Sequence, residues 1–198
     1  MSGLRQIYVE MRKQQSPEVV ERASALACAK LADLILKKAS AGAVIGLYRP
    51  ANPNRFGEAD PTALLADPRL AGFHFAYPRV VDRFQSEMDF AVPMHPSDWT
   101  TGAFGSPEPH TNLPGVEPNE IELLVVPGVV FGIDGERIGM GAGFYDRYLE
   151  FAKGAQRIGF AFDFQLLAEP IPQESWDARM DAVVTDLRVV EVASRPTQ

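Results

Sequence analysis

The 198-residue sequence lacks the features that mark secreted and membrane proteins. Cys28 is the single cysteine, so no disulfide can form within the chain, which is typical of a reducing compartment. No run of about 18 or more apolar residues occurs, so no transmembrane helix is expected. The first residues include Arg5 and Glu10 and contain no apolar signal core. We therefore expect a cytoplasmic protein without a membrane partner.

Basic residues and histidines are also few. The sequence has 19 Lys and Arg residues against 26 Asp and Glu residues, a formal net charge of −7, and three histidines. Nucleic-acid-binding domains usually carry clustered basic residues, so this charge argues against a nucleic-acid partner and favours small molecules. His74, His95 and His110 show no zinc-ligand spacing. An anionic ligand would need a local group of arginines or backbone N–H donors.

Apolar residues make up 46% of the chain, which is enough for one sizeable core. We expect a single domain spanning residues 1–198, and a monomer. Apolar runs predict strands at 43–48, 73–77, 122–127, 157–162 and 182–185. Amphipathic patterns predict helices at 3–13, 16–38, 61–65 and 143–153. Strands that alternate with helices favour an α/β fold with an open, mainly parallel sheet, helices on both faces, and ligands at the carboxyl ends of the strands.

Capping residues and prolines place several of these boundaries. Ser16 before Pro17 predicts the N-terminus of the second helix. Pro78 predicts the end of the strand that begins at residue 73. Segment 94–119 is rich in Pro, Gly, Ser and Thr, which predicts a long surface loop of the kind that often covers a site.

The most informative run is RIGMGAGFYDRY, from Arg137 to Tyr148, in which three alternating glycines precede a predicted helix. Glycine lets the backbone approach an anion closely, and a helix N-terminus adds unpaired N–H groups, so the run favours a phosphate site. Its spacing matches neither a P-loop nor the dinucleotide-binding fingerprint. Alternating glycines also occur in tight turns, so spacing alone leaves both interpretations open.

Two charged residues flank the glycines. Arg137 can pair with phosphate oxygens, and Asp146 can coordinate a hard cation such as Mg²⁺. The same two residues can equally form an ordinary surface pair, and an acidic residue at a helix N-terminus is stabilising without any metal. The residue pattern alone does not decide between these interpretations.

A longer stretch carries a resemblance to a known family. VPGVVF at 126–131, followed by GERIGMGAGFYDRYL at 135–149, resembles the signature of the 5-formyltetrahydrofolate cyclo-ligases, also called methenyltetrahydrofolate synthetases. Weaker matches extend over nearly the whole chain, at Leu4-Arg5, Glu58-Ala59-Asp60, Tyr77-Pro78-Arg79, Pro107-Glu108-Pro109, Gln165 and Asp177 to Val183.

The resemblance implies an ATP- and Mg²⁺-dependent ligase of one-carbon metabolism, with 5-formyltetrahydrofolate and ATP as its partners. In this reaction the formyl oxygen of the folate attacks the γ-phosphate of ATP. Ring closure by N10 then gives 5,10-methenyltetrahydrofolate, ADP and phosphate. Such chemistry needs positioning and charge neutralisation more than a protein nucleophile.

The resemblance also implies the residues of the site. ATP contacts would come from Arg5, Arg137, Ile138, Gly139, Met140, Gly141, Ala142, Gly143, Phe144 and Tyr145. Folate contacts would come from Leu47, Glu58, Met140, Gly141, Ala142, Gly143 and Phe144. Asp146 and Asp177 would hold Mg²⁺. Without the resemblance, Glu58 is better interpreted as a solvated loop charge.

Departures from the family pattern leave other interpretations open. Met1 stands where the family usually has Lys, and Gly132 stands where it commonly has Asp, although Asp134 is near enough to substitute. Ala142 and Trp176 are further departures. The missing Lys and Gly132 motivate the alternative of a non-catalytic folate- or nucleotide-binding relative. A kinase-like or phosphosugar enzyme on the same architecture is a third interpretation, because a fold alone does not fix a function.

Overall fold

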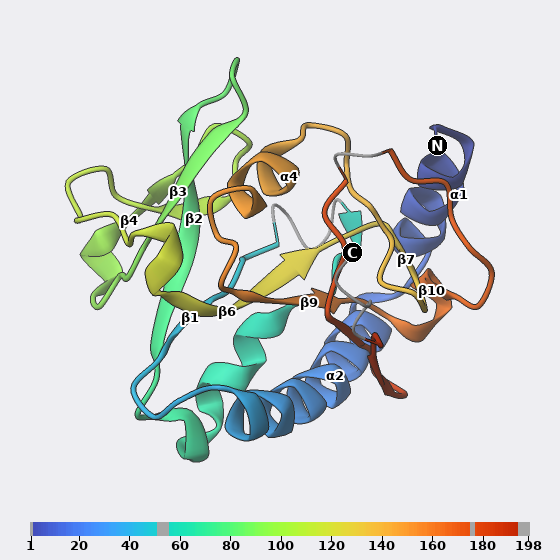
Figure 1. Ribbon diagram of the computed structural model, residues 1–198, viewed down its shortest axis with the longest axis horizontal. Coiled ribbons are helices and arrows are strands. Elements are labelled where there is room, and N and C mark those ends of the chain that lie inside the picture. The colour runs from blue at the N-terminus through green and yellow to red at the C-terminus, as the bar shows by residue number, and fades with distance from the viewer. Residues whose placement is uncertain (1, 51–55, 175–176, 194–198) are drawn as a thin grey trace.

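The computed structural model describes residues 2–50, 56–174 and 177–193, with a seven-stranded sheet at its centre (Figure 1). The strand order is β12-β11-β9-β6-β1-β2-β3. The inner strands are mutually parallel, and the edge strands β3 and β12 are antiparallel to their neighbours. The strands span Val44–Gly46 (β1), His74–Asp82 (β2), Glu87–Ala91 (β3), Ile121–Pro127 (β6), Gln156–Phe160 (β9), Ala182–Val184 (β11) and Val189–Glu191 (β12). The predicted α/β fold with a mainly parallel sheet is confirmed.

Helices cover both faces of this sheet (Figure 1). Helix α2, Pro17–Lys38, packs on one face, and the short helix α4, Phe144–Leu149, packs on the other. Along β6, Leu123 and Val125 join the core beneath α2, whereas Leu124 joins the core beneath α4. Successive side chains of a strand point to opposite faces, so one apolar run supplies both cores.

Helix α1, Ser2–Lys13, packs beside a second, three-stranded sheet of order β10-β7-β8. Leu4, Tyr8 and Val9 of α1 contact the small core formed by Val129, Val130, Ile138 and Ile171. The three strands span Leu166–Leu167 (β10), Val130–Gly132 (β7) and Arg137–Ile138 (β8). Because β8 leads directly into the glycine-rich run, α1 lies next to that run.

Helix α2 begins as its sequence predicts. The Ser16 side chain accepts a hydrogen bond from the Val19 N–H at 3.4 Å, and Pro17 occupies the first turn. Proline is favoured there because the missing N–H would have no intrahelical partner. Lys37 and Lys38 end the helix, where cations interact favourably with the dipole.

The prediction that Pro78 ends its strand was wrong, because β2 continues to Asp82. Beyond Ala76, β2 no longer pairs with β1, and its strand partner among the described residues is β3, in a register that places Pro78 opposite Phe90. A strand paired on one side tolerates proline, because the missing N–H removes no bond from a second neighbour.

Segment 94–119 is more regular than the predicted loop, and the last helix is shorter than predicted. The segment contains a hairpin of β4, Trp99–Thr101, and β5, Pro107–Pro109. Helix α4 ends at Leu149 rather than near residue 153. Short 3₁₀ helices span Pro61–Ala66 (η1), Pro68–Leu70 (η2), Pro96–Asp98 (η3), Pro118–Glu120 (η4) and Asp163–Gln165 (η5). In the described ranges, no helix has the length and apolar character needed to cross a membrane.

Candidate functional site

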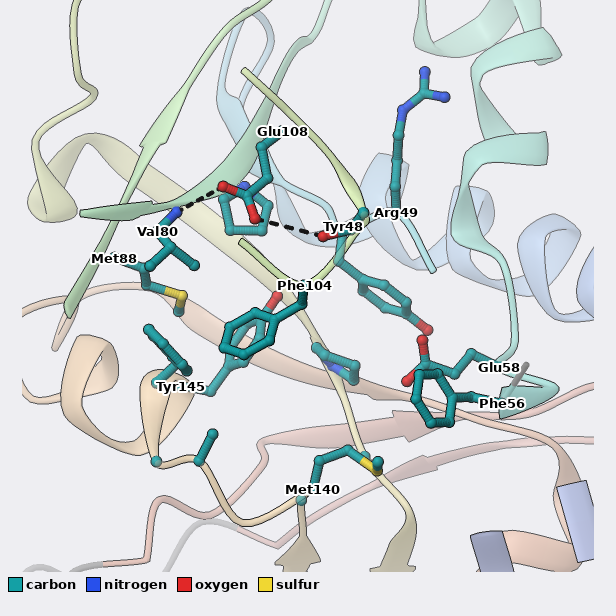
Figure 2. A pocket seen from close by; sticks show the side chains of 18 of the residues that line it. Tyr48, Arg49, Phe56, Glu58, Val80, Met88, Phe104, Glu108, Met140 and Tyr145 are labelled. Carbon is teal, nitrogen blue, oxygen red and sulfur yellow. Dashed lines mark hydrogen bonds between the residues drawn. The ribbon is translucent and has the colours of Figure 1, made fainter. Parts of the chain in front are cut away.

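A cleft of about 400 Å³ lies at the carboxyl ends of β1 and β6, where an open parallel sheet places its ligands. Figure 2 shows Val80, Met88 and Glu108 on one side of it, with Phe56 and Glu58 across from them. The lining comes from five segments: Tyr48, Arg49, Phe56 and Glu58 after β1; Pro78, Arg79, Val80 and Met88 of β2 and β3; Phe104, Ser106, Pro107 and Glu108 of the β4–β5 hairpin; Pro127 and Gly128 at the end of β6; and Arg137, Gly139, Met140, Gly141, Ala142, Gly143, Phe144, Tyr145 and Asp146.

The glycine-rich run forms one wall of the cleft and is held from behind by α1. Arg5 Nε donates a hydrogen bond to the Gly139 carbonyl at 2.8 Å. Gly141 has φ +97°, and a β-carbon there would approach the Arg5 guanidinium within 3.1 to 3.4 Å. The backbone conformation therefore favours glycine at 141, and the close approach of Arg5 leaves little room for a side chain there. Arg5 is not among the cleft-lining residues and contacts the wall from outside.

Arg137 and Asp146 form an ion pair within this wall. Arg137 Nη2 lies 2.5 Å from Asp146 Oδ1, and Arg137 Nη1 donates to the Pro127 carbonyl at 3.3 Å. Only 5% of the Arg137 side chain is exposed, against 28% for Asp146. The two residues therefore do pair with each other, and the pair lies in the lining of the cleft rather than on the open surface.

The two carboxylates predicted to hold Mg²⁺ occupy different places. Asp146 lines the cleft, whereas Asp177 is not among the lining residues. The Asp177 carboxylate accepts a hydrogen bond from the Glu174 N–H at 2.8 Å, and the backbone N–H of Asp177 donates to the Glu174 carbonyl at 3.1 Å. In the described part of the chain, no three or more His, Cys, Asp or Glu residues are grouped as they would be to hold a metal ion.

Of three further residues predicted to contact the substrates, one lines the cleft and two are buried behind it. Glu58 lines the cleft, and its side chain is 13% exposed. Leu47 is completely buried beneath the neighbouring Tyr48, which lines the cleft in its place. Ile138 is also buried, in the small core beside α1. Leu47 and Ile138 therefore shape the cleft from behind.

Tyr145 and Tyr48 both line the cleft. The Tyr145 hydroxyl is buried and has no hydrogen-bond partner in the described structure. Burial raises its pKa well above the ordinary value, although Arg137 acts in the opposite direction. Burial likewise raises the pKa of Tyr48, whose hydroxyl donates to the Ala59 carbonyl at 2.6 Å. The Tyr145 phenol is therefore neutral, and its hydroxyl is buried without a partner among the described residues.

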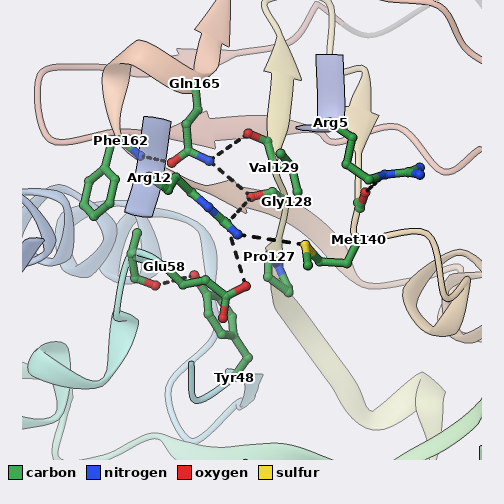
Figure 3. Close-up of polar contacts among 12 residues, drawn as sticks. Arg5, Arg12, Tyr48, Glu58, Pro127, Gly128, Val129, Met140, Phe162 and Gln165 are labelled. Carbon is green, nitrogen blue, oxygen red and sulfur yellow. Dashed lines mark hydrogen bonds and ion pairs between the residues drawn. The ribbon is translucent and has the colours of Figure 1, made fainter. Parts of the chain in front are cut away.

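Sequence reasoning missed Arg12, a buried residue of α1 that contacts the floor of the cleft (Figure 3). Arg12 donates to the Gly128 carbonyl at 3.3 Å and lies 3.7 Å from Glu58 Oε1. Gln165 holds the same floor, since its amide donates to the Val129 carbonyl at 2.8 Å. The seven-residue separation of Arg5 and Arg12, which places both on one helix face, was the available signal.

The sequence predicts that segment 94–119 is a loop of the kind that covers a site, and the β4–β5 hairpin within this segment contributes to the lining of the cleft. Glu108 Oε2 accepts a hydrogen bond from the Val80 N–H at 2.9 Å, which fastens the hairpin to β2. At the hairpin tip, Phe104 packs edge-to-face on Phe144, with ring centroids 5.7 Å apart. The hairpin therefore meets the glycine-rich wall across the cleft.

The departure at residue 132 has a structural explanation. A β-carbon at Gly132 would overlap the carboxylate of Glu136, which is buried and pairs with Arg179 at 3.1 Å. Asp134, suggested as a substitute for the missing aspartate, is instead exposed. Glu136 thus places a carboxylate at this position. Met1 and Trp176, two other departures, lie outside the described residues.

Together, the fold and cleft define an α/β protein with a cleft at the carboxyl ends of parallel strands, lined by a glycine-rich wall, arginines and carboxylates. The model of the 5-formyltetrahydrofolate cyclo-ligase family matches residues 1–186. The chain is 34% identical over 139 residues to the 5-formyltetrahydrofolate cyclo-ligase of Escherichia coli (strain K12), covering 68% of this chain and 75% of the relative. The chain therefore belongs to this family of enzymes.

Solved structures agree with this assignment. The NMR structure of Aquifex aeolicus 5,10-methenyltetrahydrofolate synthetase superposes with a TM-score of 0.81 at 30% identity, covering 100% of this chain and 95% of that one. A 5,10-methenyltetrahydrofolate synthetase from Mycoplasma pneumoniae has the same fold, with a TM-score of 0.73 at 24% identity, covering 93% of this chain and 98% of that one.

Proposed function

We propose that the protein converts 5-formyltetrahydrofolate and ATP into 5,10-methenyltetrahydrofolate, ADP and phosphate, with Mg²⁺ as cofactor. The observation that carries this proposal is the convergence of Glu58, Arg137 and Asp146 with the wall 139–143 on one cleft. These groups suit two ligands at once, because a carboxylate can accept pterin N–H donors while arginine and backbone N–H groups receive phosphate.

The proposed chemistry uses the cleft for positioning. The formyl oxygen attacks the γ-phosphorus, and ADP leaves with the electrons of the broken P–O bond. N10 then attacks the activated formyl carbon, loses its proton, and phosphate departs. Arg137 would neutralise negative charge on the phosphoryl group, and the wall at 139–143 would orient it. No covalent bond to the protein is needed.

The residues present fit a magnesium ion held by few protein ligands. Mg²⁺ commonly takes one or two carboxylates together with substrate phosphates, so a cluster of three acidic side chains is not required. Asp146 lies in the cleft wall and is partly exposed, with Oδ1 engaged by Arg137. When bound, the ion would neutralise charge on the ATP phosphates. We propose Asp146 as the main protein ligand. Asp177 stays a predicted second ligand, although it lies outside the cleft lining.

The folate would lie between Glu58 and the aromatic side of the cleft. Tyr145 offers its unpartnered hydroxyl on this side, and Phe104 with Phe144 narrows the opening. Apolar rings exclude water, which protects the phosphorylated intermediate from hydrolysis.

The experiment that tests the function follows the near-ultraviolet absorbance of the methenyl product from 5-formyltetrahydrofolate. Parallel reactions omit ATP, Mg²⁺ or the protein. We expect a rise that needs all three, with one ADP formed per methenyl product. A folded protein that binds the folate but forms no product would contradict the proposal and favour the non-catalytic alternative.

A further inference from the structure

Arg12 is a charged side chain buried beneath the cleft, with a relative exposure of 2% (Figure 3). Its guanidinium reaches the Gly128 carbonyl at 3.3 Å, Glu58 Oε1 at 3.7 Å and Met140 Sδ at 3.9 Å. All three of these residues line the cleft, whereas Arg12 does not. Arg12 thus contacts the site from below without reaching a ligand itself.

The contacts of Arg12 are poor for a stabilising buried charge. Its Nε is buried without a hydrogen-bond partner, and the three contacts are all long. Burial lowers the pKa of Arg12, and Glu58 opposes this effect. An apolar side chain of similar size at such a position is often neutral or stabilising. The stability of the fold therefore gives little reason for an arginine here.

The backbone around Glu58 is fixed against the same turn of α1. A β-carbon at Gly57 would overlap the Arg12 carbonyl oxygen, so the chain passes directly over the end of the helix. This packing involves the main chain and the β-carbon of Arg12, which a substitution to Met or Lys keeps. The side chain can therefore be replaced without removing the contact that holds residue 57 in place.

Arg12 and Arg5 extend from α1 to different parts of the site. Arg5 binds the Gly139 carbonyl of the glycine-rich wall, and the closest charged partner of Arg12 is Glu58. The two arginines are seven residues apart and therefore share one face of the helix. Because Arg5 contacts the wall proposed to bind ATP and Arg12 contacts the carboxylate proposed to bind folate, removal of each side chain is expected to affect a different substrate.

We propose that Arg12 is a positioning residue that fixes the Glu58 carboxylate on the folate side of the cleft, so that losing its guanidinium weakens folate binding much more than ATP binding. The inference rests on the proposed function. Arg12 acts only through Glu58 and the cleft floor.

The test compares steady-state kinetics of Arg12→Met, Arg12→Lys, Glu58→Gln and the double variant Arg12→Met/Glu58→Gln. Methionine keeps an unbranched chain of similar length and removes the charge, whereas lysine keeps the charge and loses the planar donor group. Lys13→Met is the matched control, because Lys13 is the adjacent cation on α1, is exposed, and pairs only with Glu10 among the described residues.

We expect Arg12→Met to raise the KM for 5-formyltetrahydrofolate by about tenfold or more, as for loss of one partner of a buried charge pair. The KM for ATP should change by less than about twofold, a difference too small to reflect a lost charge contact. Arg12→Lys should recover part of the folate affinity, and Lys13→Met should match the unsubstituted protein. The KM for 5-formyltetrahydrofolate of the double variant should not exceed that of Glu58→Gln alone, because both changes remove the positioned Glu58 carboxylate.

Equal losses for both substrates, unchanged KM values, or additive effects in the double variant would overturn the inference. If Arg12→Met does not fold, Arg12→Lys and Arg12→Lys/Glu58→Gln supply the same comparison. The unsubstituted protein separates the two proposals. Absence of product from it overturns the proposed function and this inference together, whereas normal turnover with an unaffected Arg12→Met overturns this inference alone.

Discussion

Gly141 is the residue whose backbone is most constrained in the cleft wall. A side chain at φ +97° is strained, and its β-carbon would press on the Arg5 guanidinium. We expect Gly141→Ala to lower the free energy of unfolding by on the order of 1–3 kcal/mol. It should also raise the KM for ATP more than that for folate, because the wall moves. Denaturant unfolding and steady-state kinetics measure these effects.

Gly154→Ala is the matched control for this substitution. Gly154 is exposed, and a β-carbon there would meet no atom within 4 Å. We expect this control to leave both KM values unchanged. An unaffected KM for ATP in Gly141→Ala would show that the wall does not hold the phosphates.

Asp146 is the residue on which the proposed magnesium site depends. We expect Asp146→Asn to weaken Mg²⁺ binding by roughly 10- to 100-fold, which is the loss of metal affinity typical for substitutions at a metal site. Rates measured across Mg²⁺ concentrations should show the largest loss at limiting Mg²⁺. Asp134→Asn is the control, because Asp134 is exposed on the preceding segment. An unchanged rate of Asp146→Asn at limiting Mg²⁺ would show that Asp146 is not a ligand.

At the scale of elements, the β4–β5 hairpin reaches the glycine-rich wall through Phe104 and Phe144. An aromatic pair contributes about 0.5–1.5 kcal/mol beyond its buried area, so we expect Phe104→Ala to raise the KM for folate several-fold. Stability should change little, because Phe104 is 53% exposed. Phe84→Ala, at the exposed tip of the β2–β3 hairpin, is the control. Equal KM values for both variants would show that the Phe104 contact does not close the cleft.

Strand β12 is joined to the end of α2 through a carboxylate. Glu191 lies 2.8 Å from Lys37 Nζ and 2.9 Å from Lys38 Nζ, and their hydrogen bonds lower its pKa to about 2, from the ordinary 4.5. A lowered pKa in the folded state means that this stabilisation is present above pH 4.5 and is lost as the pH falls toward 2.

Unfolding measured from pH 7 to pH 2 tests this contact. The unsubstituted protein should exceed Glu191→Gln in stability at neutral pH, and the difference should shrink below pH 4.5. The exposed Glu150, which forms no ion pair in the described ranges, gives the control Glu150→Gln. A difference that stays constant with pH would contradict the assigned ion pairs.

At the scale of the whole molecule, the sequence predicted the features that repeat along the chain or occur within short segments. The apolar runs located β6, β9 and β11, and Ser16-Pro17 located the start of α2. The alternating glycines located one wall of the cleft. These signals are local, because the spacing of apolar residues and the capping of helices depend on residues close together in the sequence.

Features set by tertiary contacts were not predictable from a single sequence. Arg12 meets Gly128 and Met140 across 116 and 128 residues of chain. Its seven-residue spacing from Arg5 indicates a shared helix face, but not which distant residues that face contacts. Strands of two or three residues, such as β7 and β8, exist through pairing rather than propensity. The direction of Leu47 into the core likewise follows from the way β1 packs in the sheet.

The most direct test of the whole account is a crystal structure of the protein with ADP, Mg²⁺ and 5-formyltetrahydrofolate. We predict that the nucleotide phosphates lie against residues 139–143 and Arg137, and that the pterin ring contacts Glu58. Binding of either ligand outside this cleft would contradict the account.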